Sequence, residues 1–238
     1  MTTRPYNRSL HPDDYAFLRH AEPLRAFEQE MRANGVGHRE WHPHRLWEYA
    51  SMMQQLEELA VPTDALIVDV GSGGSFFPPY LATVGDYRRV ELTDSMKYGD
   101  INADVQSQRA HYGIALPLYD LPCENMSYLA DEVYDVAMCI STIEHVEAHH
   151  HDLALRELCR IVKRGGLIFI TSDYFRAGDH AHFANSPSRH LQFTAYNEDF
   201  VARIPSMIPA DFVGPTDFAY RGDFVHTYSF VNICLRKR

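Results

Sequence analysis

In the first third of the chain, a carboxylate is followed by a cluster of glycines. These residue types suit a site in which a ligand lies directly against the backbone. The stretch 65–77 reads ALIVDVGSGGSFF, in which Asp69 lies in an apolar β-branched run and Gly71, Gly73 and Gly74 follow it. Because glycine lacks Cβ and reaches left-handed conformations, a ligand can approach this turn closely. The pattern predicts a buried strand, a binding turn, and a helix that begins near Pro78.

Three classes of nucleotide site begin with such a strand, turn and helix, and the residues distinguish among them. A Walker loop requires Lys-Ser or Lys-Thr after its last glycine, which is missing here. A dinucleotide site requires a third glycine where Phe76 stands. The remaining pattern, Asp69-x-Gly71-x-Gly73, resembles motif I of the class I S-adenosylmethionine-dependent methyltransferases. An ordinary glycine turn in an α/β protein is the alternative.

The next expected strand, at 88–93, leads to a second carboxylate. In a doubly wound sheet a carboxylate at this strand end accepts hydrogen bonds from ribose hydroxyls, which makes Asp94 the candidate. Glu91 competes with it, because the interval from Asp69 to Asp94 is slightly long for the family. Strand alternation and its terminal place favour Asp94.

A third strand is expected at 113–118, and a turn closed by Pro122 follows it. The resemblance implies that Asp120 binds the adenine amino group and that the Leu121 amide binds a ring nitrogen. An aspartate in an ordinary turn explains Asp120 equally well. The cofactor-binding residues that the resemblance implies are Asp69, Gly71, Ser72, Gly73, Asp94, Asp120, Leu121 and Ile140.

The segment 134–166 resembles the small-molecule branch of the same family, the methyltransferase domain 11-like branch. A strand at 133–140 precedes Glu144-His145-Val146, and a helix then leads to Lys163-Arg164-Gly165-Gly166, where the family has Lys-Pro-Gly-Gly. We expect Gly165 to cap this helix and 167–171 to form the next strand. The end of this 133–140 strand lacks the Asn- or Asp-Pro-Pro-Tyr signature of amino-methylating nucleic-acid enzymes.

Methyl transfer is an in-line displacement, so the protein supplies positioning and, where needed, a base for the acceptor's proton. Histidine is the natural base near neutral pH, and we predict His145 first and His190 second as catalytic residues. Either could instead be a structural or surface histidine. We place the acceptor at the carboxyl edge of the sheet. The expected acceptor-binding residues are Trp41, Tyr49, Tyr174 and His182, although aromatic residues beside a helix, such as Trp41 and Tyr49, more often belong to the core.

A metal-assisted reaction was weighed against this prediction. Some methyltransferases of this fold carry Glu-x-x-Glu-His and a later histidine, but Ser141 replaces the first glutamate here. Losing a carboxylate weakens an oxygen-rich site, so we predict no metal. The run His149-His150-His151 is expected to be a solvated helix start that could bind metal adventitiously.

The whole pattern predicts an α/β, Rossmann-like, doubly wound sheet of seven strands, mostly parallel, that ends in an antiparallel hairpin of 211–220 and 224–235. We expect residues 1–42 to form an N-terminal cap and residues 43–238 to form the methyltransferase domain.

The composition limits the classes of partner that we expect the chain to bind. The net charge of −10 repels a nucleic-acid polyanion, so we expect a small-molecule acceptor and no nucleic acid. No apolar run is long enough for a membrane span, and we expect a cytoplasmic protein whose four scattered cysteines are core residues. Oligomeric state does not follow from these patterns.

Overall fold

The computed structural model describes residues 6–38, 44–96, 99–176, 196–222 and 228–238. The described chain forms two compact units, Asp13–Pro122 and, together, Met1–Pro12 with Cys123–Arg238. Trp41, His182 and His190, which the sequence predicts to bind or react with the acceptor, lie outside the described residues.

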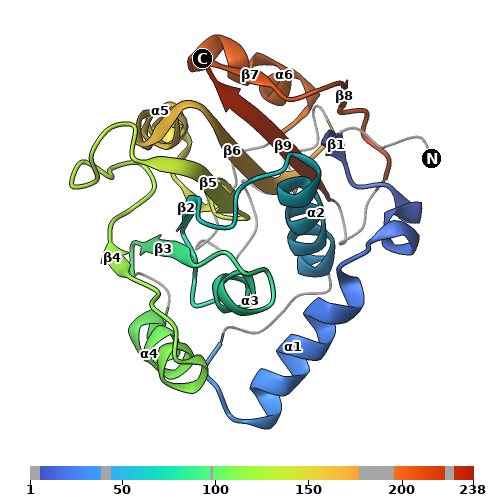
Figure 1. Cartoon of the computed structure of the whole chain (residues 1–238). Helices are drawn as coiled ribbons and strands as arrows, with labels where there is room; N and C mark the ends of the chain where they lie inside the picture. Colours follow the sequence, from blue (N-terminus) through green and yellow to red (C-terminus); the bar gives the residue numbers. More distant parts are fainter. Residues whose placement is uncertain (1–5, 39–43, 97–98, 177–195, 223–227) are drawn as a thin grey trace. The chain divides into compact units, whose positions relative to one another are not determined.

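The unit Asp13–Pro122 contains a short parallel sheet with helices around it (Figure 1). Its strands follow the order β4-β3-β2, and the register pairs Val70 with Thr93 and Asp94 with Asp120. Parallel strands buried on both faces are largely apolar, and β2 is buried at every position and apolar except at Asp69. The elements are η1 (Pro12–Phe17), α1 (Ala21–Ala33), α2 (Arg45–Glu58), β2 (Leu66–Val70), α3 (Phe77–Thr83), β3 (Arg89–Asp94), α4 (Ile101–Tyr112) and β4 (Leu118–Asp120).

The strand predicted at 113–118 is wrong in its bounds, because β4 begins only at Leu118. A helix precedes it. The Asp100 side chain accepts from the Ala103 N–H at the start of α4, and Gly113 ends α4 with a φ of 63°. Glycine takes this left-handed conformation without strain, which is why it stops a helix here instead of opening a strand.

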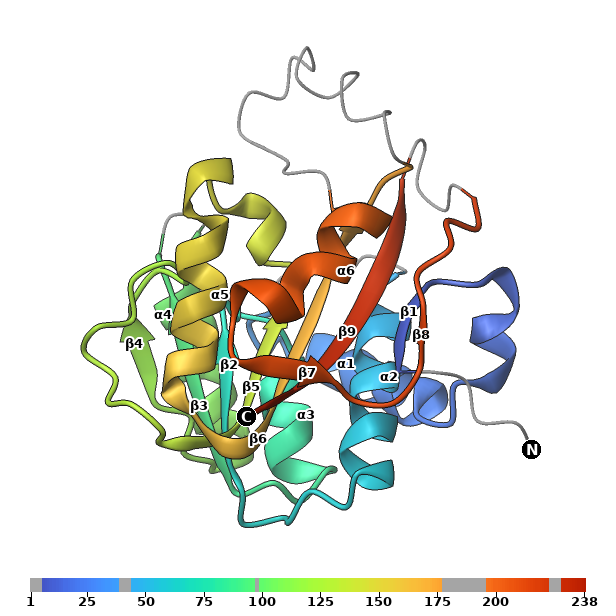
Figure 2. The same ribbon diagram turned by 90° about the horizontal axis from the view of Figure 1, so that it is seen from above.

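The other unit is built on long strands (Figures 1 and 2). β5 pairs in parallel with β6, and β6 pairs antiparallel with β9 from Leu167–Arg236 to Tyr174–Ser229. Helices α5 and α6 lie side by side in Figure 2. The elements are β1 (Asn7–Ser9), β5 (Tyr134–Ile140), η2 (Ile143–His145), η3 (Ala148–His150), α5 (His151–Ile161), β6 (Val162–Tyr174), α6 (Glu198–Met207), β7 (Ala210–Phe212), β8 (Thr216–Asp217) and β9 (Ser229–Lys237).

The sheet topology confirms the α/β, Rossmann-like class, but the described residues form nine strands instead of the predicted seven. The predicted strand 211–220 is divided into β7 and β8, since Gly214 has a φ of 73° and Pro215 has no N–H to donate. β1, which the sequence did not predict, pairs antiparallel with β9 and in parallel with β8. The predicted boundary at residue 42 stays a prediction.

The end of α5 also differs from the prediction. The helix ends at Ile161, and Val162 is already extended, so Gly165 is not its cap. The register of β5 with β6 shifts between Tyr134 and Val136, which leaves residues 163–166 as a bulge where Gly165 has a φ of 77°. An ion pair of 2.7 Å from Lys163 Nζ to Asp135 Oδ1 holds the bulge to β5.

Two simpler expectations agree with the described residues. All four cysteines are buried free thiols. None of the described helices combines the length and the apolar character that crossing a bilayer requires.

Candidate cofactor site

The glycine loop in the unit Asp13–Pro122 is fixed by backbone bonds to the neighbouring strand. The amides of Gly71 and Ser72 both donate to the Thr93 carbonyl, at 2.8 and 3.1 Å. Gly71 and Gly73 have φ values of 73° and 59°, which an L side chain adopts only at a cost. The loop therefore turns sharply at the carboxyl end of β2 and runs alongside the end of β3.

Asp94 binds the loop from the end of β3. One carboxylate oxygen accepts from the Gly73 N–H at 2.9 Å, and the other accepts from the Met96 N–H at 3.0 Å. Each oxygen keeps a second lone pair for a further donor. The competing Glu91 instead hydrogen-bonds Tyr119. This geometry favours Asp94 as the ribose ligand, and the assignment stays a prediction.

Asp69 is buried beside a second carboxylate, and Arg45 offsets its charge only in part. Its residue is 3% exposed, and no described residue donates a hydrogen bond to its carboxylate. Burial, and next the Asp94 carboxylate, raise the pKa of Asp69 to about 7, while Arg45 opposes the shift. A buried carboxylate beside a second one is costly unless positive charge arrives.

A cationic ligand with hydroxyl donors fits these residues. The Ser72 hydroxyl is buried and has no partner among the described residues, so it can bind a ligand atom. Asp69 offers a countercharge, and Asp94 offers acceptors for hydroxyl groups. S-adenosylmethionine carries a sulfonium, an ammonium and a ribose, and these groups match the loop.

A glutamine on α4, which sequence reasoning missed, holds the far side of the loop. Gln108 Nε2 donates to the carbonyls of Gly74 and Ser75 at 3.2 and 3.3 Å, and to Gly37 at 3.0 Å. A Cβ on Gly74 would lie 2.8 Å from an Asp104 carboxylate oxygen. α4 thus approaches the loop closely and binds its carbonyls.

A sequence signal for Gln108 exists. Ile101, Val105 and Gln108 are the buried residues of α4, at helical spacing. A glutamine therefore stands where the third apolar residue of the stripe belongs. A polar residue in an apolar stripe marks a buried hydrogen-bonding task.

The two residues predicted to bind adenine differ in whether their binding groups already have hydrogen-bond partners. Asp120 is exposed and pairs in register with Asp94. The Leu121 amide donates to the carbonyls of Asp94 and Tyr119, at 2.9 and 3.0 Å. Its predicted bond to an adenine nitrogen would compete with these bonds.

In the other unit, Ile140 ends β5 and is buried. Ser141 follows with a φ of 42°, a left-handed conformation that is strained for serine. This turn leads into η2, in which Glu144 is buried and His145 is exposed to solvent. An exposed imidazole can exchange protons, so its position is compatible with the predicted base.

Two predicted acceptor ligands are packed in the interior of their units. Tyr49 stacks on Phe77, with centroids 4.4 Å apart, and burial raises its pKa to about 12. The Tyr174 hydroxyl donates to the Phe218 carbonyl. Both therefore support the fold, and direct contact with an acceptor stays a prediction.

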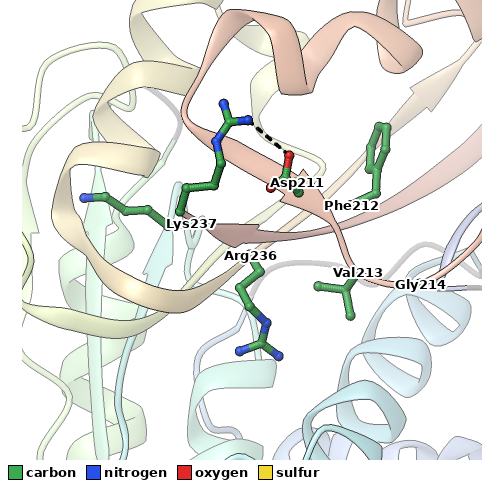
Figure 3. Close-up of a pocket in the computed structure, with 7 residues that line it drawn as sticks. Asp211, Phe212, Val213, Gly214, Arg236 and Lys237 are labelled. Atoms are coloured by element: carbon green, nitrogen blue, oxygen red, sulfur yellow. Dashed lines mark hydrogen bonds and ion pairs between the residues drawn. The ribbon is translucent and has the colours of Figure 1, made fainter.

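A pocket of about 400 Å³ lies beside β7 and β9 (Figure 3). Arg236 and Lys237 point apart in Figure 3, and Arg238 pairs with Asp211. The cations do not converge on one point, and none of the predicted site residues lines this pocket. Its lining is Asp211, Phe212, Val213, Gly214, Arg236, Lys237 and Arg238.

The chain is similar to known proteins in sequence and in fold. A family model described as a methyltransferase domain matches residues 68–170. No curated protein matches the chain. Among solved structures, the 1,6-didemethyltoxoflavin-N1-methyltransferase of Burkholderia thailandensis is 13% identical, with 96% of this chain and 91% of that chain covered and a TM-score of 0.59.

Two further structures share the fold. The geranyl diphosphate C-methyltransferase of Streptomyces coelicolor is 11% identical, with 97% of this chain and 99% of that chain covered and a TM-score of 0.58. The cyclase SpnF is 14% identical, with 80% and 82% covered and a TM-score of 0.62. Because such distant likeness shows the fold alone, the reaction type rests on the family model and the loop.

Replacing Asp69 by asparagine is expected to stabilise the apo protein at pH 8 and to weaken S-adenosylmethionine binding. Since the folded pKa of Asp69 lies above the usual 3.8, the folded state binds the proton more tightly, and stability falls as pH rises toward 7. Asp69→Asn removes this loss, so Tm should rise by about 2 to 4 °C for each kcal/mol gained. Thermal unfolding at pH 5 and 8, with exposed Asp64→Asn as the control, measures it; a lower Tm at pH 8 would contradict this account.

Asp94→Asn should weaken S-adenosylhomocysteine binding by about 10- to 100-fold, because one backbone N–H then faces an amide NH₂ and the ribose loses a charged acceptor. The matched control, Glu91→Gln, should change affinity less than about twofold. Calorimetric titration measures both. A larger effect of Glu91→Gln would assign the ribose contact to Glu91.

Gln108→Leu should lower the free energy of unfolding by about 1 to 3 kcal/mol, because buried carbonyls lose their donor. Cofactor affinity should fall with it, since the loop is no longer held. Urea unfolding and titration are compared with Gln106→Leu, an exposed position on the same helix. If both variants behave like the native protein, Gln108 does not hold the loop.

Proposed function

We propose that the chain, which belongs to the class I S-adenosylmethionine-dependent methyltransferases, transfers the methyl group directly to an oxygen or nitrogen atom of a small molecule. The observation that carries the proposal is the buried Asp69 carboxylate beside Asp94 and the glycine loop. When bound, S-adenosylmethionine supplies an electrophilic methyl group on a positively charged sulfur.

Charge supports a small acceptor over a nucleic acid. The chain has a net charge of −10, so a polyanion would approach against a repulsive field. The structure of the toxoflavin-pathway relative is named with bound 1,6-didemethyltoxoflavin, and that of the Streptomyces relative with geranyl diphosphate. Small molecules are therefore ligands of proteins that share this fold. Because one of the two is a C-methyltransferase, carbon acceptors belong in the test.

Different residues of the chain would bind the cofactor and remove the acceptor's proton. Asp94 accepts hydrogen bonds from the ribose hydroxyls, and Asp69 balances the positive charge of the bound cofactor. His145 at the end of η2 takes the acceptor's proton, and His190 is the second candidate. No covalent intermediate with the protein is needed, since the displacement is in line.

Transfer of labelled methyl from S-adenosylmethionine to fractionated cell extract tests the proposal. Label is expected in the small-molecule fraction, with and without EDTA. Label found only in protein, polysaccharide or nucleic acid would overturn the acceptor class. Tight S-adenosylhomocysteine binding without any transfer would instead indicate a cofactor-binding protein that does not catalyse methylation.

With an acceptor in hand, His145→Gln is expected to lower kcat by about 10²- to 10⁴-fold, the usual contribution of a general base. Affinity for S-adenosylhomocysteine should stay within about twofold, because a base acts in the transition state. His111→Gln, a histidine on α4 in the other unit, is the control. An unchanged kcat would remove His145 from the reaction.

A further inference from the structure

Two imidazoles and a carboxylate gather just before α5. One ligand atom from each of Glu147, His149 and His150 lies within 4.8 Å of the others. The side chains of His149 and Glu147 are 69% and 55% exposed, so an ion can reach them from solvent. Apart from each other, these three side chains have no polar partner among the described residues. They are therefore available as ligands.

The backbone holds the cluster together. The His150 N–H donates to the Glu147 carbonyl at 2.8 Å, which closes the single turn of η3. Side chains three residues apart eclipse one another in such a turn, so Glu147 and His150 share a face. The chain thus places a carboxylate and an imidazole together without any long-range contact.

His151, the last of the three consecutive histidines, points into the interior of its unit and holds the η3 turn in place. His151 Nε2 donates to the Val146 carbonyl at 3.0 Å, and its ring lies 5.5 Å from that of Tyr196. Of three consecutive histidines, only the first two therefore face Glu147.

The distances resemble those around a metal ion. His149 Nε2 and Glu147 Oε2 are 3.4 Å apart, longer than a strong charged hydrogen bond. Two ligand atoms on a tetrahedral zinc, each about 2.1 Å from it, are separated by about 3.4 Å. The rings of His149 and His150 have centroids 4.0 Å apart, so both nitrogens can turn toward one ion.

We propose that Glu147, His149 and His150 form a binding site for a transition-metal ion such as Zn²⁺ or Ni²⁺. Two imidazoles and one carboxylate suit these ions, whereas Mg²⁺ prefers oxygen ligands. Three protein ligands leave a coordination position open. From the sequence alone, the run His149-His150-His151 is expected to be a solvated helix start with at most adventitious metal binding.

The charges around the proposed metal site both oppose and favour a bound cation. A cation at the N-terminus of α5 meets the positive end of the helix dipole. Glu147 and Asp152, which lies exposed in the first turn of α5, oppose this repulsion. Binding therefore depends on Glu147 as much as on the imidazoles.

Equilibrium dialysis of the tag-free full chain against Zn²⁺, Ni²⁺ and Mg²⁺ tests the site. We expect saturable binding of Zn²⁺ and Ni²⁺ but not of Mg²⁺. The variants Glu147→Gln and His149→Asn/His150→Asn should each weaken Zn²⁺ binding at least about tenfold, as losing ligands from a three-ligand site does. These positions are at the surface, so circular dichroism should stay unchanged.

The control is His111→Asn. His111 Nε2 lies 2.9 Å from Glu30 Oε1, so this pair offers an imidazole and a carboxylate without a third ligand. Zn²⁺ affinity should be unchanged in this variant. Equal Zn²⁺ affinity in the native chain and the His149→Asn/His150→Asn variant would overturn the proposal, as would equal loss in the control.

Discussion

The candidate cofactor site depends on one electrostatic constraint: two carboxylates are buried side by side at the ends of neighbouring parallel strands. The register of β2 with β3 brings Asp69 and Asp94 together, and the loop between β2 and α3 encloses them. Asp94 is satisfied by two amides, whereas Asp69 receives none from the described residues. Buried charge of this kind destabilises a fold, and it persists where a ligand brings the opposite charge.

Hydrogen bonds on both sides hold the loop in place before a ligand binds. Thr93 and Asp94 bind its amides, and Gln108 binds its carbonyls from α4. A loop whose donors and acceptors are already used does not have to be ordered when the ligand arrives, which lowers the entropic cost of binding. α4 is therefore part of the cofactor site although its side chains need not touch the ligand.

The unit that carries His145 is organised by a different kind of interaction. The long antiparallel ladder of β6 with β9 forms its core, and the turns η2 and η3 lie between β5 and α5. Along η2, η3 and the first residue of α5, Glu144 and His151 face inward, and His145 and His149 face outward. The fixed inward residues set the direction of the outward ones, which are the chemically available groups.

The sequence by itself determined the strand, glycine loop and helix at 65–83 and the two carboxylates, because these depend on local chemistry: apolar runs, left-handed glycines and residues at strand ends. Only the tertiary structure decided what depends on distant partners. β1 forms because β9 offers it an edge, and β8 pairs in turn with β1. Gly165 lies in a bulge because the β5 register shifts there, and Gln108 matters because α4 meets the loop. Interaction partners far apart in the chain leave no local pattern, so the raised pKa of Asp69 beside Asp94 could not be read from spacing.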